Sequence, residues 1–267
     1  MQLNSNNNYS SHRKNNLHLI LKNTLPLHIE HVCSSILNGD LPQNIKTLSV
    51  GRDVIYLLPI DTEHKLLIKI YTHGGLFSFF KYWFLTNRCL NEFNLFTRIL
   101  DNNLPVPEYL GIFWIKKHVF YKCGVITQYI PDAYTLEEFL ISDSISNDEK
   151  QNISLKTGEI IKRMHRLGVY HKDLQTRNIL IDSKSNSVFL IDFDKAMTKK
   201  NLNNFHRSFN LIRLKRSFIK RNIPLHFYNT LLKGYGDVTF SFLANLLASP
   251  HLTWVSIKTL IKKHITF

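Results

Sequence analysis

The sequence has no hydrophobic run long enough to cross a membrane. Its longest apolar stretches, residues 77–85 and 239–248, are interrupted or reach only half of the roughly 20 residues that a spanning helix needs. The polar N-terminal segment also lacks the apolar core of a secretory signal. We therefore expect a protein of the cytosol, or one that is attached to a membrane from the cytosolic side.

Cysteine is scarce. Cys33, Cys89 and Cys123 are scattered along the chain without a CxxC pair, which excludes a disulfide framework and a zinc knuckle. The 13 histidines do not show the HExxH spacing of a metal site either. We expect three reduced thiols in or near the core.

Acidic residues are fewer than basic ones. There are 20 Asp and Glu residues against 34 Lys and Arg residues, which leaves a formal charge of +14. Such a surface attracts anionic partners. Nucleic acid, an anionic lipid surface and a phosphorylated or carboxylated substrate would each satisfy this charge. Because the basic residues are spread along the chain rather than gathered in one arm, we expect no nucleic-acid partner.

The hydrophobic pattern changes twice along the chain. Residues 1–25 are rich in Asn and Ser and predict a flexible extension. From residue 45, short β-branched and aromatic runs predict antiparallel strands, interrupted by one helix over residues 88–100. Helical patterns dominate after residue 131. This order predicts a β-rich lobe over residues 26–130 and a mainly helical lobe over residues 131–267.

Several helix boundaries can be predicted from local signals. Thr135 and Ser146 each precede a glutamate by three residues, which is the capping-box pattern at a helix start. Gly168 is placed to end the second of these helices. A later helix, beginning after residue 201, is expected to carry its basic residues on the outside. These are Arg207, Arg213, Lys215, Arg216, Lys220 and Arg221.

One pair of motifs carries most of the functional information. The loop His171-Lys172-Asp173-Leu174 is followed by Asn178 and then by the turn Asp192-Phe193-Asp194, an order and spacing typical of the catalytic loop and metal-binding turn of protein kinases. Phosphoryl transfer depends mainly on positioning and on charge neutralisation. We predict that Asp173 positions the acceptor hydroxyl, while Asn178 and Asp192 hold Mg²⁺ against the phosphates of ATP.

These motifs, with the order of the two lobes, predict the fold class. We expect an α+β, bilobal protein-kinase-like fold with an antiparallel β-rich N-lobe and a mainly helical C-lobe, together one kinase-like domain. Such a fold needs a strand lysine for the α- and β-phosphates and a helical glutamate that orients it. Lys69, inside LLIKIY, and Glu92, on the next helix, are the predicted pair. Lys65 is the alternative lysine, at the polar end of the same strand.

The remaining nucleotide contacts have weaker signals. Gly51 is the one glycine where the phosphate-covering loop of protein kinases has three, and it could equally be a simple turn residue. The connector between the lobes should place backbone groups of Gln128 and Ile130 at the adenine edge.

Six segments resemble, in the same order, those of the bacterial lipopolysaccharide kinases, and look most like those of the 3-deoxy-D-manno-octulosonic acid (Kdo) kinases. They fall within residues 45–222 and read IKIYTHGGLFSFFKYWFL, EFNLF, LPVPEYLG, YHKDLQTRNILID, LIDFDKA and NLIRLKRS. Asp194, where protein kinases have glycine, and Gln175, where they have lysine, are shared with that family. These departures point to a small-molecule or glycolipid acceptor.

The resemblance implies an activity. It implies transfer of the γ-phosphate of ATP to the 4-hydroxyl of a Kdo residue on a lipid A precursor, by a peripheral protein at the cytoplasmic face of the inner membrane. A basic surface would suit both this anionic acceptor and the anionic membrane. Arg177 would neutralise the transferred phosphoryl group or bind the sugar carboxylate, unless it is only a loop arginine. The aromatic residues 77–85 would enter the lipid headgroup region, unless they pack in the core.

Three other readings remain open from the sequence. Two are enzymes with the same catalytic residues: a kinase for a core heptose, and a phosphotransferase of the aminoglycoside or choline type. The third is a pseudokinase that binds a partner without turnover. Retention of Lys69, Asp173, Asn178 and Asp192 together argues against the third reading.

Overall fold

The computed structural model describes residues 8–14, 16–26, 28–49, 53–62, 64–71, 88–117 and 120–241. The chain divides into two compact units. The first comprises Met1–Thr97 and Pro107–Tyr129, and the second Arg98–Val106 and Ile130–Phe267. Within the described residues, no helix has the length and apolar character required to cross a membrane.

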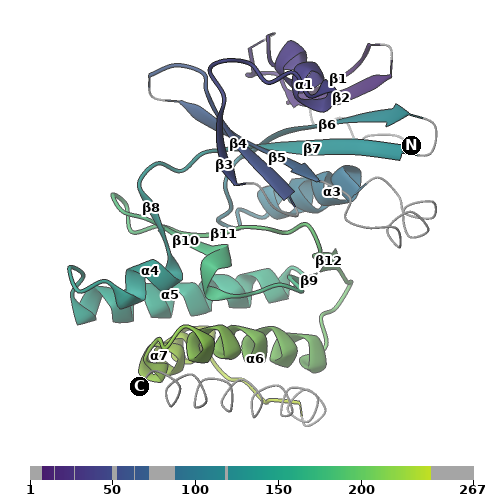
Figure 1. The fold of residues 1–267 in the computed structure, drawn as a ribbon. Helices are drawn as coiled ribbons and strands as arrows, with labels where there is room; N and C mark the ends of the chain where they lie inside the picture. Colours follow the sequence, from purple (N-terminus) through teal and green to yellow (C-terminus); the bar gives the residue numbers. More distant parts are fainter. Residues whose placement is uncertain are drawn as a thin grey trace, which may run out of the picture. The chain divides into compact units, whose positions relative to one another are not determined.

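The first unit is built on a seven-stranded antiparallel sheet (Figure 1). The strand order is β1-β2-β6-β7-β5-β4-β3. The strands are β1 (Tyr9–Lys14), β2 (Leu17–Lys22), β3 (Lys46–Ser49), β4 (Asp53–Pro59), β5 (Lys65–Tyr71), β6 (Tyr109–Lys117) and β7 (Phe120–Gln128). The predicted antiparallel strands after residue 45 are therefore present.

The N-terminal segment is part of this sheet, so the predicted flexible extension over residues 1–25 is wrong for Tyr9–Lys22. Strand β2 pairs with β6 from Leu17 opposite Ile115 to Leu21 opposite Gly111. Its leucines are buried, with Leu19 only 1% exposed. The Asn- and Ser-rich composition did not indicate the short apolar strand β2. This strand depends on pairing with β6, which is distant in the sequence, so no local signal predicts it.

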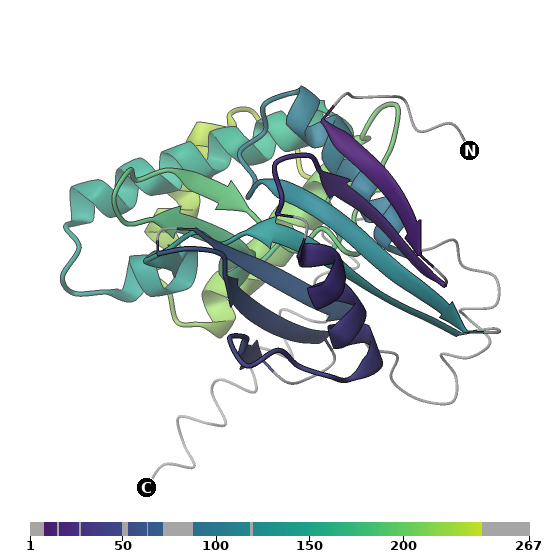
Figure 2. The same ribbon diagram turned by 90° about the horizontal axis from the view of Figure 1, so that it is seen from above.

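The sheet carries a helix on each face (Figure 1). On one face, Ile68 and Ile70 of β5 pack in a core with residues of α1 (Ile29–Asn38), which lies across the strands in Figure 2. On the other face lies α3 (Arg88–Asp101), where the predicted helix begins as expected. The ring of Phe96 stacks on Tyr109 with centroids 3.8 Å apart. Side chains alternate along β5, so Lys69 and Tyr71 face α3 and not the α1 core.

The second unit is mainly helical. Both predicted capping boxes are confirmed, because the hydroxyls of Thr135 and Ser146 accept from the backbone N–H of Glu138 and Glu149, and the backbone N–H groups of Thr135 and Ser146 donate to those carboxylates in return. The helices are α4 (Leu136–Ile141), α5 (Asn147–Arg166), α6 (Asn204–Lys220) and α7 (Leu225–Tyr235).

Helices α5 and α7 approach closely through glycine. A Cβ atom on Gly158 would lie 2.0 Å from Leu231 O, and one on Gly234 would lie 2.1 Å from Leu155 O. Only residues without a side chain permit this separation of the two backbones.

Two small sheets frame the loop between α5 and α6. A three-stranded sheet orders β11 (Val188–Leu190), β10 (Ile179–Asp182) and β8 (Ala133–Thr135). A two-stranded sheet pairs β9 (Val169–Tyr170) with β12 (Met197–Thr198). One short 3-10 turn, η1 (Thr176–Asn178), leads into β10. These pairings hold both ends of the segment that carries the two predicted motifs.

Candidate active site

The catalytic segment starts at a glycine that the structure requires. Helix α5 ends next to Gly168, whose φ of +74° lies in the left-handed region. A Cβ atom there would lie 2.0 Å from Lys199 O, and Lys199 N donates to Gly168 O at 2.8 Å. The predicted role of Gly168 at the helix end is confirmed. The same contact joins the start of the loop to the chain beyond the Asp192 turn.

His171 anchors the loop through a buried imidazole ring. Its side chain is fully buried, and Nε2 donates to Ile191 O at 2.9 Å, which ties the loop to the residue before Asp192. The ring lies 4.7 Å from the ring of Phe193. Burial lowers the pKa of His171, so the neutral imidazole is favoured. His171 is therefore a positioning residue.

A second buried histidine supports the first. His165 Nε2 lies 3.1 Å from Asn210 Oδ1, and Nδ1 lies 2.8 Å from the Tyr235 hydroxyl. Because the amide oxygen only accepts, Nε2 carries the proton and Nδ1 accepts from the tyrosine. Asn210 Oδ1 also accepts from His171 N at 3.4 Å. Helices α5, α6 and α7 thus converge on the residue that begins the catalytic loop.

This arrangement predicts a specific pH dependence of stability. Burial lowers the pKa of His165 from 6.5 to about 4. Since its folded-state pKa is depressed, His165 stabilises the native state fully above pH 6.5, and that stability is lost as the pH falls toward 4. The expected loss from this group is about 3 kcal/mol, at 1.36 kcal/mol per pKa unit.

Urea unfolding of wild type and His165→Gln between pH 7.5 and pH 4 measures this loss in the free energy of unfolding. We expect the variant to be less stable at pH 7.5 but to lose less stability on acidification. His64→Gln, at an exposed histidine of the first unit, is the control for the loss of a histidine as such. Parallel pH profiles for wild type and His165→Gln would contradict the assignment.

Asp173 lies at the centre of the site and is held by two cations. Its side chain is 13% exposed. Arg213 Nη2 donates to Oδ1 at 2.6 Å, and Lys195 Nζ lies 3.5 Å from Oδ2. A carboxylate held in this way keeps one orientation, which is what a group that positions an acceptor hydroxyl requires.

Asn178 is arranged to present its amide oxygen. The side chain is buried, and Nδ2 donates to Asp173 O at 2.9 Å. Ile191 N donates to Asn178 O at 3.0 Å, which brings the start of the Asp192 turn beside it. Asp192 has a positive φ of 65°, a conformation that non-glycine residues rarely adopt and that recurs at functional sites. The structure thus groups Asp173, Asn178 and the Asp192 turn.

These residues fit a magnesium ion that phosphates complete. An amide oxygen and a carboxylate are the hard oxygen ligands that Mg²⁺ prefers, and it commonly takes few protein ligands together with substrate phosphates. Among the described residues there is no cluster of three or more His, Cys, Asp or Glu side chains that could hold a metal unaided. Asn178 and Asp192 therefore stay predictions as metal ligands.

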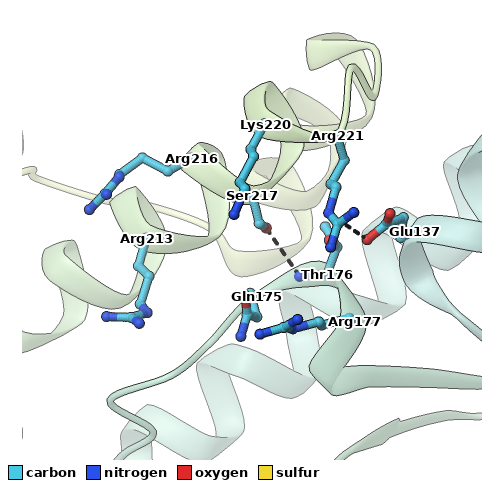
Figure 3. A pocket seen from close by; sticks show the side chains of 9 residues that line it. All are labelled: Glu137, Gln175, Thr176, Arg177, Arg213, Arg216, Ser217, Lys220 and Arg221. Atoms are coloured by element: carbon cyan, nitrogen blue, oxygen red, sulfur yellow. Dashed lines mark hydrogen bonds and ion pairs between the residues drawn. The ribbon is translucent and has the colours of Figure 1, made fainter. Parts of the chain in front are cut away.

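A basic pocket of about 200 Å³ lies within the second unit (Figure 3). One wall is the loop before β10, and the other is the side of α6 that carries Arg213, Arg216, Ser217 and Lys220. Thr176 N donates to Ser217 Oγ at 3.0 Å and joins the two walls. Arg213, which bonds Asp173, is also a lining residue. The pocket is lined by Glu137, Gln175, Thr176, Arg177, Arg213, Arg216, Ser217, Lys220 and Arg221.

The expectation that the basic residues of this helix only decorate its outside is therefore wrong for Arg213 and Arg216. Both are half-buried and line the pocket. The sequence did contain a signal, because positions 213, 216, 217 and 220 share one helical face. Neither the contact from Arg213 nor that from Lys195 to Asp173 was anticipated.

In the first unit, Tyr71 contacts both residues of the predicted nucleotide pair. Lys69 Nζ lies 5.2 Å from the centroid of the Tyr71 ring, and the Tyr71 hydroxyl donates to Glu92. Glu92 is 6% exposed. Burial, and then the charge of Glu92, raise the pKa of Tyr71, which keeps that donor protonated. The structure brings Lys69 and Glu92 to one face of the sheet, and their roles stay predictions.

Lys69 also has an unanticipated acidic neighbour. Its Nζ lies 3.8 Å from Asp53 Oδ2, on the adjacent strand β4. Lys65, the alternative lysine, is exposed at the start of β5. Lys69, which is only one-fifth exposed, stays the predicted phosphate-binding lysine.

The other predicted nucleotide contacts have different outcomes. Gln128 N donates to Glu108 O at 2.9 Å within the first unit. Ile130 is half-buried at the start of the second unit. Both stay predictions. Gly51 and the aromatic segment over residues 77–85 lie outside the described residues.

Comparison with solved structures identifies the fold. The structure titled "WaaP in complex with acyl carrier protein" is similar with a TM-score of 0.60, over 90% of this chain and 97% of that chain. The sequence identity is 14%, so this likeness concerns the fold alone. The predicted α+β kinase-like fold, with an antiparallel β-sheet region followed by a helical region, is confirmed.

Comparison with known sequences identifies the family. The chain is 33% identical over 181 residues to the 3-deoxy-D-manno-octulosonic acid kinase of Vibrio vulnificus strain CMCP6, covering 63% of this chain and 73% of that protein. It is 32% identical over 186 residues to the enzyme of the same name from Vibrio cholerae, covering 67% and 76%. The model of the lipopolysaccharide kinase (Kdo/WaaP) family matches residues 62–235. Since the matched residues make up more than half of this chain, the chain belongs to the lipopolysaccharide kinase (Kdo/WaaP) family.

Proposed function

We propose that this kinase transfers the γ-phosphate of ATP to the 4-hydroxyl of a Kdo residue on a lipid A precursor, in the biosynthesis of the lipopolysaccharide inner core. The observation that carries the proposal is the carboxylate of Asp173, held by Arg213 and Lys195 beside Asn178, in a chain whose relatives from two Vibrio species are Kdo kinases. The family membership makes the protein an ATP-using kinase. The acceptor sugar and its hydroxyl are the proposed part.

Each site residue has a proposed role. Asp173 orients the acceptor hydroxyl and accepts its proton, while Arg213 keeps that carboxylate in place. Asn178 Oδ1 and the Asp192 carboxylate would hold Mg²⁺, which neutralises phosphate charge when bound. Lys69 binds the α- and β-phosphates and Glu92 orients it, with Gly51, Gln128 and Ile130 beside the nucleotide. Arg177, exposed at the rim of the pocket, faces the transferred group or the acceptor.

An assay with competing acceptors tests the proposal. The purified protein is incubated with γ-labelled ATP and, separately, with a Kdo-bearing lipid A precursor, a heptosylated core and soluble amino sugars. We expect label on the Kdo-bearing precursor, with a mass increase of one phosphate on the Kdo residue. Labelling of heptose alone would favour the core-heptose kinase, and labelling of amino sugars alone would refute a glycolipid acceptor. No transfer to any acceptor, with ATP binding intact, would favour a pseudokinase.

We also propose that the protein acts as a peripheral protein at the cytoplasmic face of the inner membrane. The formal charge of +14 supports this placement, because anionic lipids attract basic surfaces. Binding to vesicles that contain anionic lipid should fall as salt rises, since exposed charges are screened over a Debye length of about 8 Å at physiological ionic strength. Equal binding to neutral and anionic vesicles at every salt concentration would contradict it.

A further inference from the structure

The basic pocket beside Asp173 has more positive charge than its own residues neutralise. Five of its lining residues are basic and one, Glu137, is acidic. Arg221 Nε lies 3.2 Å from Glu137 Oε2, and Arg213 is paired with Asp173. Among the described residues, no carboxylate forms an ion pair with the other three basic side chains, which are Arg177, Arg216 and Lys220.

One of these three side chains has a buried donor in need of an acceptor. Arg216 Nε is inaccessible to solvent, and no acceptor among the described residues bonds it. Burial, and then the charge of Arg213, lower the pKa of Arg216, which means that the surroundings disfavour its positive charge. A buried donor without a partner is unfavourable, and a charge-assisted bond to an anion relieves it strongly.

The pocket is also connected to the catalytic carboxylate. The same guanidinium of Arg213 lines the pocket and donates to Asp173 Oδ1 at 2.6 Å. Figure 3 shows Arg213, Arg216 and Lys220 along α6, with Gln175 and Arg177 on the opposite wall. The Arg213 side chain therefore links an anion bound in the pocket to the Asp173 carboxylate. The volume of about 200 Å³ suits one small group, since sites that enclose a drug-sized ligand occupy roughly 300–1,000 Å³.

We propose that this pocket binds the carboxylate that the acceptor sugar carries close to its reacting hydroxyl, with Arg216 and Lys220 as the binding residues. The inference rests on the proposed function, because a Kdo acceptor is a sugar acid. A planar carboxylate matches the paired N–H groups of a guanidinium, and a phosphate on the lipid A precursor is the other source of the same anionic chemistry. The pocket would then select acidic sugars as acceptors.

The kinetic test uses Arg216→Met and Lys220→Met, which remove one charge each. The matched control is Lys215→Met on the same helix, whose Nζ lies 6.0 Å from the centroid of the Tyr228 ring and not in the pocket. We expect the two pocket variants to raise the KM for the Kdo-bearing precursor about 10- to 100-fold. Their KM for ATP should stay within about twofold of wild type. The control should match wild type for both substrates.

Two altered acceptors identify the bound group. If the carboxylate is bound, methyl esterification of the Kdo should raise the wild-type KM and add little in the pocket variants. If a lipid A phosphate is bound instead, removing that phosphate should raise the wild-type KM and esterifying the carboxylate should not. That result would overturn the carboxylate assignment. If each altered acceptor raises the KM by the same factor in wild type and in the pocket variants, the pocket binds neither group, and the proposal is wrong.

A binding measurement separates this inference from the proposed function. Free Kdo and inorganic phosphate are titrated into wild type, Lys220→Met and Lys215→Met, and the shift in Tm is followed. We expect Kdo to raise the Tm of wild type and Lys215→Met but not of Lys220→Met. If Kdo raises the Tm in this pattern but is not phosphorylated, the proposed function is wrong and the binding pocket is supported. If Kdo is phosphorylated but raises the Tm of all three proteins equally, only the pocket assignment is wrong. Lys220 is exposed, so its variant should fold even if Arg216→Met does not.

Discussion

Asp173→Ala is expected to abolish measurable phosphoryl transfer while leaving ATP binding close to that of wild type. A positioned group that takes a proton in the transition state contributes about 10²- to 10⁴-fold to the rate. The Asp173 carboxylate is oriented by Arg213 at 2.6 Å and Lys195 at 3.5 Å, and its assigned partner is the acceptor hydroxyl rather than the nucleotide. The loss should therefore appear in kcat, with little change in the dissociation constant of ATP.

The experiment combines steady-state kinetics with a direct measurement of ATP binding. Asp143→Ala, at an exposed turn between α4 and α5, removes the same group away from the site and should remain fully active. Because Asp173→Ala leaves two cations without their partner, Asp173→Asn is the companion variant, and it should be nearly as inactive. Turnover near that of wild type in both Asp173 variants would show that this carboxylate does not act on the acceptor.

Asp192→Asn is expected to lower activity strongly at low Mg²⁺ and to recover part of it as Mg²⁺ is raised. An amide keeps an oxygen in place but loses the negative charge that attracts the metal. Asparagine is also one of the few residues that accept a positive φ, so the backbone at 65° need not change. The apparent Mg²⁺ requirement should rise by at least about tenfold, which corresponds to roughly 1.4 kcal/mol of lost metal affinity.

Activity measured over a wide range of Mg²⁺ at saturating ATP gives the result. Asp182→Asn is the matched control, because its carboxylate accepts from Ser185 Oγ and Lys184 N in an exposed turn, where an amide oxygen can keep one of these two bonds. It should show the wild-type Mg²⁺ dependence. A loss in Asp192→Asn that has the same size at every Mg²⁺ concentration would argue against a metal ligand at this position.

The parts of the fold that rest on neighbouring residues could be predicted from the sequence. The capping boxes at Thr135 and Ser146 and the helix end at Gly168 each depend on atoms within a few residues of each other. The bond from Asn178 Nδ2 to Asp173 O spans five residues of one loop. The strands over residues 9–22 could not be predicted, because β2 is stabilised by β6, almost a hundred residues away, and not by its own composition.

By itself, the sequence determined where the predicted site residues lie along the chain. The spacing of Asp173, Asn178 and Asp192 indicated a kinase-type loop, since those groups are held by one short stretch of backbone. Only the tertiary structure decided what surrounds the catalytic carboxylate. Arg213 reaches Asp173 across forty residues of chain, and the half-buried Arg216 lines the same pocket. Their helix can be predicted from periodicity, but which of its faces meets the catalytic loop depends on how α6 packs in the folded unit.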